Sequence, residues 1–532
     1  MEPQTQAPPR RRTAVNAAIF SAATGLSRIA GLIREVVAAR YFGTTGPASA
    51  FTLAFQIPNL IRALVADAAL SSAFVPVFSE LLEHKRRREA YLLASALAGL
   101  LLVVLGLISL GFILFAPLIV PLFTGDEFTA ALTDLCVGLS QVLFPIVVLL
   151  GLNGLAVGIL NAHDHFTIPA IAPLVWNVVI ILGLVGVTPF FHGDHRIYGY
   201  AIGVVAGTLV QLLMMVPELR RIGFPVARIA LPCRGDPRVR RVLVLMFPVS
   251  LGLGLINIDL VLNSVIGSLV SDQTPAAIDK AFRIYMLPQG MFSVAVATVL
   301  FPQLSRLAAR GDRQGLKAVT GNGLRQIALL LIPAAAATAV LATPMVRLVY
   351  QRGEFDAEST HLVSKALFVF AFSLPFSGWN LMLTRAFFSL QRPWLPTTLA
   401  GVSLVVNAAI SFALYTPLGI AGPVLGTVIS NALLTGLEGA YLRRELGGLE
   451  LARTALACFG MLAGAGLLAE LSWATWWALD HVFGRSLIAQ LISVGGGLSL
   501  GALAYGAVVL WLPIPEARQV LDLFASRLKR RS

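Results

Sequence analysis

The sequence predicts an all-α polytopic membrane protein with about fourteen transmembrane helices. Hydrophobic residues fill 57% of the 532 positions, and charged residues fill only 13%. A soluble domain is usually about 25% charged. The apolar residues recur in blocks long enough to cross ~30 Å of hydrocarbon as helix, and the sequence lacks the alternating strands of a membrane barrel. The net charge is +13, and the basic residues lie in short loops between the apolar blocks. This placement is typical of the positive-inside rule for membrane proteins and argues against nucleic-acid binding.

The apolar blocks, read between charged or Pro/Gly-rich breaks, give the expected spans in order. Several exceed ~20 residues, which predicts tilted or kinked helices. The blocks lie at roughly 14–40, 50–82, 92–123, 130–160, 168–189, 198–217, 242–270, 279–305, 321–349, 360–390, 395–415, 420–441, 454–480 and 487–513.

Basic residues gather in alternate loops, which predicts the topology. One side receives residues 10–12, 85–88, the arginine-rich loop 220–241 and the tail 527–531. Loops on the other side, such as 44–49, 124–128 and 271–274, hold almost none. By the positive-inside rule both termini lie in the cytoplasm, and we expect the N-terminal tail to be retained rather than cleaved as a signal peptide.

Proline landmarks recur along the chain and indicate an internal duplication. Residues 57–59 (Ile-Pro-Asn) resemble 287–289 (Leu-Pro-Gln), and residues 74–79 resemble 300–305. Because an even number of spans precedes the repeat, we expect two six-helix lobes related by a pseudo-two-fold axis along the membrane normal, with the site between them. The alternative is that prolines are simply common in membrane helices. The predicted parts are a cytoplasmic tail (1–13), an N-lobe with helices 1–6 (14–230), a C-lobe with helices 7–12 (231–445), helices 13 and 14 (446–513) and a basic cytoplasmic tail (514–532).

Four arginines within or near the spans are the candidate substrate-binding residues. Arg28 and Arg34 interrupt the first span, Arg62 the second, and Arg283 lies near the outer end of the eighth. A cation in hydrocarbon costs at least ~2.5–3.5 kcal/mol, so such residues usually face a cavity. The repeat makes spans 2 and 8 equivalent, and we therefore expect these arginines to converge.

Arginine in such a cavity suits a phosphate or pyrophosphate ligand that carries a lipid. Its guanidinium keeps its charge when desolvated, and its planar fork matches phosphate oxygens. We expect Ser27, Glu35 and Asp67 to support the cavity. The alternative is that Arg28, Arg34 and Arg62 form internal salt bridges with Glu35 and Asp67, or that these arginines reach an interface.

Asp259 is an acid within the seventh span. A buried carboxylate without a partner takes up a proton or binds a cation. Asn407 and Thr427 would complete an oxygen-lined site for Na⁺ or H⁺. A polar contact between packed helices is an equal alternative.

No pattern in the sequence indicates an enzyme. The three cysteines lack C-x-x-C spacing, and His163-Asp164-His165 in a short loop is more typical of a solvated turn than of a metal site. No Gly-rich nucleotide loop is present, so ATP is not the expected energy source. We expect a transporter without a cofactor, with Na⁺ or H⁺ as the candidate coupling ion.

A series of motifs extends over about residues 14–445. They are Ser27-Arg28-x-x-Gly31-x-x-Arg34-Glu35, Ala39-Arg40-Tyr41-Phe42-Gly43, Phe55-Gln56-Ile57-Pro58-Asn59-Leu60-Ile61-Arg62, Phe74-Val75-Pro76, Gly158-Ile159-Leu160-Asn161, Phe166-x-Ile168-Pro169-Ala170 and Arg283 with Leu287-Pro288 and Leu300-x-Pro302-x-Leu304-Ser305. Together these motifs resemble the MurJ (MviN) family of bacterial lipid II flippases. The resemblance implies the fold of the multidrug/oligosaccharidyl-lipid/polysaccharide exporter superfamily. It also implies that Arg28, Arg34, Arg62 and Arg283 handle a pyrophosphate, and that helices 13 and 14 form a groove for a polyprenyl tail.

Two positions depart from the family pattern. Ser49 stands where relatives often have Asp. Ser411 stands where some relatives have an acidic residue that belongs to a cation site. Its presence weakens the interpretation of Asp259 as part of a Na⁺ site.

The predicted function is translocation of the lipid-linked peptidoglycan precursor, lipid II, from the inner to the outer leaflet of the bacterial plasma membrane. The mechanism would be alternating access, in the service of cell-wall biogenesis and cell shape. Expected partners are lipid II, membrane lipids and the cell-wall synthesis machinery, with no nucleic acid. The alternatives are a flippase for another polyprenyl-pyrophosphate-linked glycan, a cation-coupled multidrug antiporter, which would need an acidic cavity, and a polyprenyl-phosphate transferase, which would need a catalytic cluster.

Overall fold

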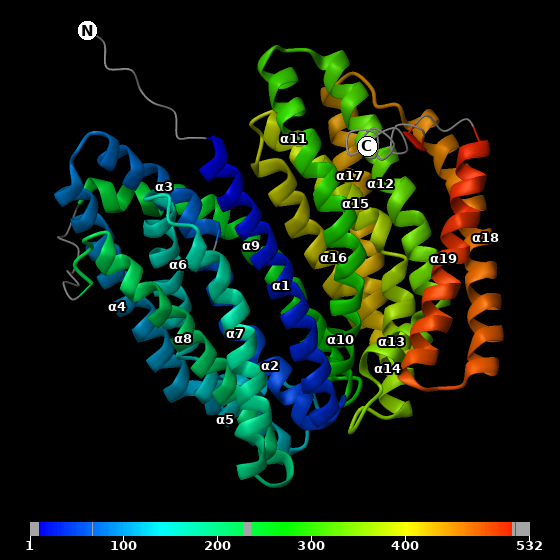
Figure 1. Cartoon of the computed structure of the whole chain (residues 1–532), viewed down its shortest axis with the longest axis horizontal. Helices are drawn as coiled ribbons and strands as arrows, with labels where there is room; N and C mark the ends of the chain where they lie inside the picture. The colour runs from blue at the N-terminus through cyan, green and yellow to red at the C-terminus, as the bar shows by residue number, and fades with distance from the viewer. Residues whose placement is uncertain (1–9, 66–67, 227–235, 513–515, 518–532) are drawn as a thin grey trace. The chain divides into compact units, whose positions relative to one another are not determined.

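The computed structural model describes residues 10–65, 68–226, 236–512 and 516–517, and every regular element among them is a helix (Figure 1). The predicted all-α fold class is therefore confirmed. The chain folds into two compact units, the first formed by Met1–Ser268 and the second by Leu269–Ser532.

The first unit is a bundle of long apolar helices. Its helices are α1 (Arg10–Phe42), α2 (Gly46–Val65), α3 (Ala68–Glu83), α4 (Arg87–Ile119), α5 (Ala130–Leu143), α6 (Ile146–Ala162), α7 (Thr167–Gly186), α8 (Tyr198–Arg221) and α9 (Pro237–Ser268), with short turns η1 (Val120–Phe123), η2 (Thr188–Phe190) and η3 (Gly193–Ile197).

Helix α9 packs against α2 and α3, and it therefore belongs to the first unit. Two ion pairs attach the N-terminal end of α9 to neighbouring helices. Arg238 contacts Glu89 of α4 at 2.7 Å, and Arg241 contacts Glu80 of α3 at 3.0 Å. The hydrogen bond from the Arg238 side chain also lowers the pKa of Asp236. The border between the two compact units lies at residues 268 and 269. The lobe border at residues 230 and 231 was predicted from the sequence repeat, and it stays a prediction.

The second unit contains the remaining helices. They are α10 (Thr274–Pro288), α11 (Val294–Ala309), α12 (Arg313–Val340), α13 (Ala342–Tyr350), α14 (Ala357–Ala371), α15 (Leu374–Ser389), α16 (Trp394–Leu418), α17 (Ala421–Glu445), α18 (Leu451–Phe483) and α19 (Leu487–Trp511), with the π-helical turn η4 (Gln289–Ser293) between α10 and α11.

Each of the predicted apolar blocks contains one helix or two consecutive helices. In the described part of the chain, nine helices are long and apolar enough to cross a membrane, or ten if the pair α14 and α15, bent by 47°, is one span. The predicted count of fourteen is therefore not confirmed. Blocks 2, 4, 8, 9 and 10 each contain two α-helices. The six-span offset relates block 2 to 8 and block 4 to 10, whereas block 3, related to 9, contains α4 followed by the short turn η1. This recurrence supports the duplication.

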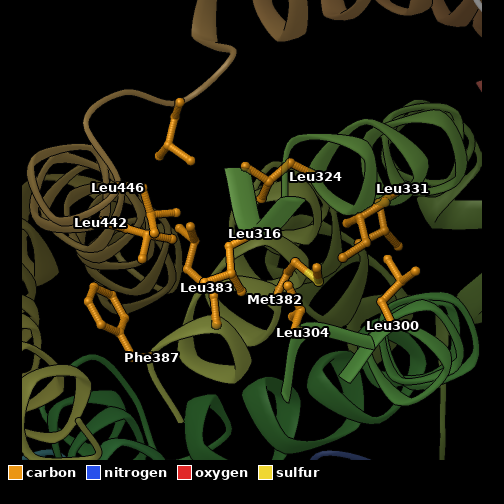
Figure 2. Close-up of a cluster of buried hydrophobic side chains, with 13 residues drawn as sticks. Leu300, Leu304, Leu316, Leu324, Leu331, Met382, Leu383, Phe387, Leu442 and Leu446 are labelled. Carbon is orange, nitrogen blue, oxygen red and sulfur yellow. The ribbon is translucent and has the colours of Figure 1, made fainter. Parts of the chain in front are cut away.

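Leucine side chains build the apolar core of the second unit. Figure 2 shows residues of α11, α12, α15 and α17 pointing into one space, among them Leu304, Leu316, Leu383 and Leu442. Fully burying a leucine side chain contributes about 1.5–3 kcal/mol. This core holds α15 and α17 together at their C-terminal ends.

Helices α18 and α19 pack as a hairpin with close backbone approach (Figure 1). A Cβ added to Gly501 would lie 2.9 Å from the carbonyl oxygen of Leu468 and would also collide with Oγ of Ser472. Small residues at such positions allow membrane helices to pack closely. The hairpin is therefore a tightly packed body.

Candidate functional site

Arg34 lies inside the first unit and carries a compensated charge. Its side chain is 9% exposed and donates two hydrogen bonds to Oε1 of Glu35, at 2.6 Å from Nη2 and 3.2 Å from Nε. Its guanidinium also lies over the ring of Trp176 in α7, 4.8 Å from the centroid. The internal salt bridge, one of the two alternatives for Arg34, is thus present.

Arg28 has different surroundings on the same helix. Six residues separate it from Arg34, about 9 Å along the axis and roughly 120° around it. The Arg28 side chain is exposed, and within the described ranges it forms no ion pair. Of these two cations in α1, Arg28 is the one available to a ligand.

The backbone beside Arg28 is fixed by α7. Asn177 donates a hydrogen bond from Nδ2 to the carbonyl oxygen of Ser27 at 3.4 Å. The same amide group also donates to the carbonyl oxygen of Pro173 at 2.9 Å. Asn177 therefore anchors the turn of α1 that presents Arg28.

Arg62 takes part in a polar contact between α2 and α9. It donates to Oδ1 of Asn59 from Nε at 3.0 Å and from Nη2 at 2.8 Å, and Asn59 donates to Oδ1 of Asn257 at 3.3 Å. One helical turn before Asn59, Gln56 donates a hydrogen bond to Oγ of Ser264 in α9 at 2.7 Å. These bonds orient the half-buried Arg62 side chain. Asp67, its predicted partner, lies outside the described residues.

Arg283 belongs to α10 of the second unit. Its Nε donates to Oδ2 of Asp279 at 2.8 Å, and about a third of its side chain is exposed. The expected convergence of Arg283 with Arg28, Arg34 and Arg62 stays a prediction.

The predicted cation site draws on both units. Asp259 lies in α9 of the first unit and accepts a hydrogen bond from Asn263 at 3.4 Å. Asn407 and Thr427 lie in α16 and α17 of the second unit, where Asn407 accepts a hydrogen bond from Ser411 at 3.0 Å. This three-residue site stays a prediction. Among the described residues, no group of three His, Cys, Asp or Glu side chains has a geometry that could hold a metal ion.

Apart from Thr427, sequence reasoning missed several buried or half-buried polar residues of the second unit. Arg325 of α12 contacts Glu450 and Glu516, and Arg347 of α13 contacts Asp480. These partners lie more than a hundred positions apart in the chain, so spacing could not reveal them. A second group is readable in α17, where Thr427, Asn431, Thr435 and Glu438 recur every three or four residues along one helix face.

Comparison with known proteins assigns the chain to a family. The family model described as "Lipid II flippase MurJ" matches residues 38–487. Over 434 residues the chain is 32% identical to the probable lipid II flippase MurJ of Rhizobium meliloti (strain 1021), covering 78% of each protein. Over 431 residues it is 31% identical to the lipid II flippase MurJ of Burkholderia cenocepacia, covering 79% of this chain and 82% of that protein.

Solved structures show the same fold. A structure titled lipid II flippase MurJ, inward closed conformation, matches with a TM-score of 0.76 at 23% identity, over 92% of this chain and 98% of that one. An inward-facing multidrug resistance MATE transporter of the MOP superfamily matches with a TM-score of 0.68 at 15% identity, over 79% and 94% of the two chains. The chain is a multi-pass protein of the bacterial inner membrane and belongs to the lipid II flippase MurJ family.

Proposed function

We propose that this protein translocates lipid II from the inner to the outer leaflet of the bacterial plasma membrane. The observation that carries the proposal is Arg28, an exposed cation in an apolar helix of a chain that belongs to the MurJ family. A pyrophosphate brought beside it would regain, as charge-assisted hydrogen bonds, part of the hydration that it loses on leaving water.

The other arginines take complementary roles in this proposal. Arg34 is already paired with Glu35 and lies over Trp176, so its proposed part is to hold α1 against α7 beside Arg28. Arg62, oriented by Asn59, supplies a second guanidinium fork. Arg283 is proposed to add a contact from the second unit. The hairpin of α18 and α19 is proposed to guide the polyprenyl tail.

The proposed transport cycle is alternating access. The cationic surface opens first to the cytoplasm and then to the outside, while the lipid tail stays in hydrocarbon. Both termini are proposed to be cytoplasmic, in line with the basic loops. The return of the empty protein to its cytoplasm-facing conformation would be driven by the membrane potential or by a coupling ion. The membrane potential contributes ~2.3 kcal/mol per charge per 100 mV.

Complementation in bacteria depleted of their own lipid II flippase tests this function. Wild type, Arg28→Ala, Arg62→Ala and the control Arg88→Ala, an exposed arginine at the start of α4, are compared at matched membrane levels. Outer-leaflet lipid II is measured by its accessibility to an externally added enzyme that cleaves it. We expect rescue by wild type and Arg88→Ala, and loss of rescue in the other two.

Two results would contradict the proposal. Failure of well-inserted wild type to restore outer-leaflet lipid II would move the substrate to another polyprenyl-pyrophosphate-linked glycan. Full rescue by both Arg28→Ala and Arg62→Ala would show that these arginines do not handle the headgroup.

A further inference from the structure

A buried carboxylate in α17 was not among the residues considered for the cation site. Glu438 is 1% exposed. Its Oε1 accepts a hydrogen bond from the Thr384 hydroxyl of α15 at 3.0 Å, and its Oε2 has no hydrogen-bond partner in the described part of the chain. An ionised carboxylate in such surroundings is strongly disfavoured unless a cation compensates it.

The structure supplies no such cation among its described residues. Helices α14, α15 and α16 pack against α17. The nearest basic residue in sequence to the Thr384 contact is Arg385, whose guanidinium lies over the ring of Phe301, 5.2 Å from its centroid. None of the titratable residues of these four helices forms an ion pair with Glu438; they are Glu358, His361 and Lys365 of α14, Arg385 of α15, Tyr415 of α16, and Tyr441, Arg443, Arg444 and Glu445 of α17.

Glu438 ends a polar seam between α15 and α17, formed by Ser373, Asn380, Thr384, Asn431, Thr435 and Glu438. Thr435 donates to Oδ1 of Asn380 at 2.5 Å, and Asn380 donates to Oδ1 of Asn431 at 3.2 Å. Asn431 in turn donates to Oγ of Ser373 at 2.9 Å. The seam is a row of hydroxyl and amide groups inside an apolar bundle.

Apolar side chains close the other end of the seam. Leu442, one turn after Glu438, is fully buried and packs in the same core as Leu383 and Phe387 of α15 (Figure 2). Arg443 and Arg444, which follow Leu442, are exposed, and neither forms an ion pair with Glu438. Glu438 therefore faces polar but uncharged groups on one side and leucine on the other.

We propose that Glu438 is a proton-binding site of the second unit. When Oε1 is protonated, the carboxylic acid can donate a hydrogen bond to the Thr384 hydroxyl oxygen. Oε2 is then a neutral carbonyl oxygen and carries no share of a negative charge. A metal ion fits poorly, because the only group hydrogen-bonded to the carboxylate is one hydroxyl among the described residues. Use of this proton to drive lipid movement rests on the proposed function, whereas proton binding itself does not.

The test uses the purified full-length protein without lipid II. Dicyclohexylcarbodiimide reacts with protonated carboxyl groups in apolar surroundings, and mass spectrometry locates the adduct. We expect an adduct on Glu438 at pH 7 that is absent in Glu438→Gln and unchanged when choline replaces Na⁺. The exposed helix cap Asp312 serves as the unreactive control. Above the titration midpoint, labelling should fall roughly tenfold per pH unit.

A second measurement does not depend on reagent access. The thermal unfolding temperatures of wild type and Glu438→Gln are compared from pH 5.5 to 8.5. A site that keeps its proton when folded and releases it on unfolding loses stability as pH rises, so the advantage of the glutamine variant should grow with pH. A pH-independent difference, or protection of Glu438 from labelling by Na⁺, would overturn the proposal. Since neither assay involves flipping, the result is independent of the complementation experiment.

Discussion

Arginines inside the two units differ in what compensates their charge. Arg28 of the first unit is exposed and has no ion pair in the described ranges. Arg325 of the second unit is 4% exposed, and it contacts Glu516 at 2.5 Å and Glu450 at 2.8 Å. Both lie in helices of an apolar chain, and from sequence alone either could be a ligand site. The difference teaches that ion-pair partners, rather than the presence of an arginine in an apolar helix, distinguish a binding residue from a structural one.

The buried or half-buried ion pairs of the second unit lie at both ends of α18. Arg325 binds Glu450 just before this helix and Glu516 beyond α19, and Arg347 binds Asp480 near its C-terminal end at 2.5 Å. The Arg347 guanidinium also lies 5.6 Å from the ring centroid of Trp476. The hairpin is thus fastened to α12 and α13 by charge as well as by packing.

The largest expected effect is that of Arg325→Ala. Removing this guanidinium leaves Glu516, which is 2% exposed, without its cation and takes from Glu450 the nearer of its two cations, which costs roughly 3–5 kcal/mol. We expect a marked drop in the thermal unfolding temperature of the purified protein in detergent. Arg313→Ala, an exposed arginine at the start of the same helix, is the control and should match wild type. Equal unfolding temperatures for all three proteins would refute the structural role of Arg325.

A smaller loss is expected for Arg347→Met, which keeps the aliphatic bulk but removes the charge. The pair is partly exposed, so the expected cost is about 1.5–3 kcal/mol, the contribution of a hydrogen bond to a charged group. A double-mutant cycle with Asp480→Asn in the same unfolding assay isolates the pair. Additive effects of the two changes would mean that the contact contributes nothing.

Close packing of the hairpin sets the next effect. Gly501→Ala places a methyl group against the backbone oxygen of Leu468, and overpacking of this kind typically costs 1–3 kcal/mol, about the range expected here. Gly506→Ala on the same helix meets nothing within 4 Å and serves as the control. If the two variants unfold at the same temperature, the hairpin has room that the structure does not show.

The smallest expected effect concerns a helix cap in a loop. Asp356 accepts a hydrogen bond from the backbone N–H of Ser359 at 2.8 Å at the start of α14, and this bond lowers the pKa of Asp356. Asp356→Ala should cost about 1 kcal/mol at neutral pH. Because the lowered pKa stabilises the folded state only above the unfolded value near ~3.9, the difference from wild type should shrink as pH falls below about 4. A difference that persists at low pH would mean that the carboxylate charge is not what stabilises the cap.

The lengths of the apolar blocks predicted much of the fold, because helix formation inside a membrane depends mainly on local hydrophobicity. The blocks at 454–480 and 487–513 correspond to α18 and α19. Breaks inside blocks were harder to place, since the bend between α14 and α15 changes direction without a charged loop.

The site was only partly predictable for a related reason. Arg28 and Arg34 share one motif, yet one is exposed and the other is buried against Glu35 and Trp176. That difference depends on α7, more than a hundred residues away. Glu438 lies near Arg443 and Arg444, so in sequence it resembles a residue at the membrane surface, and only the packing of α15 reveals its burial.

The most direct test of the contrast between binding and structural arginines is the thermal unfolding of Arg28→Ala, measured beside its rescue of a flippase-depleted strain. An exposed cation without a structural partner should change stability by no more than about 0.5 kcal/mol, while its loss abolishes outer-leaflet lipid II. A large drop in unfolding temperature, comparable to that of Arg325→Ala, or undiminished rescue would contradict the assignment of Arg28 as the binding cation.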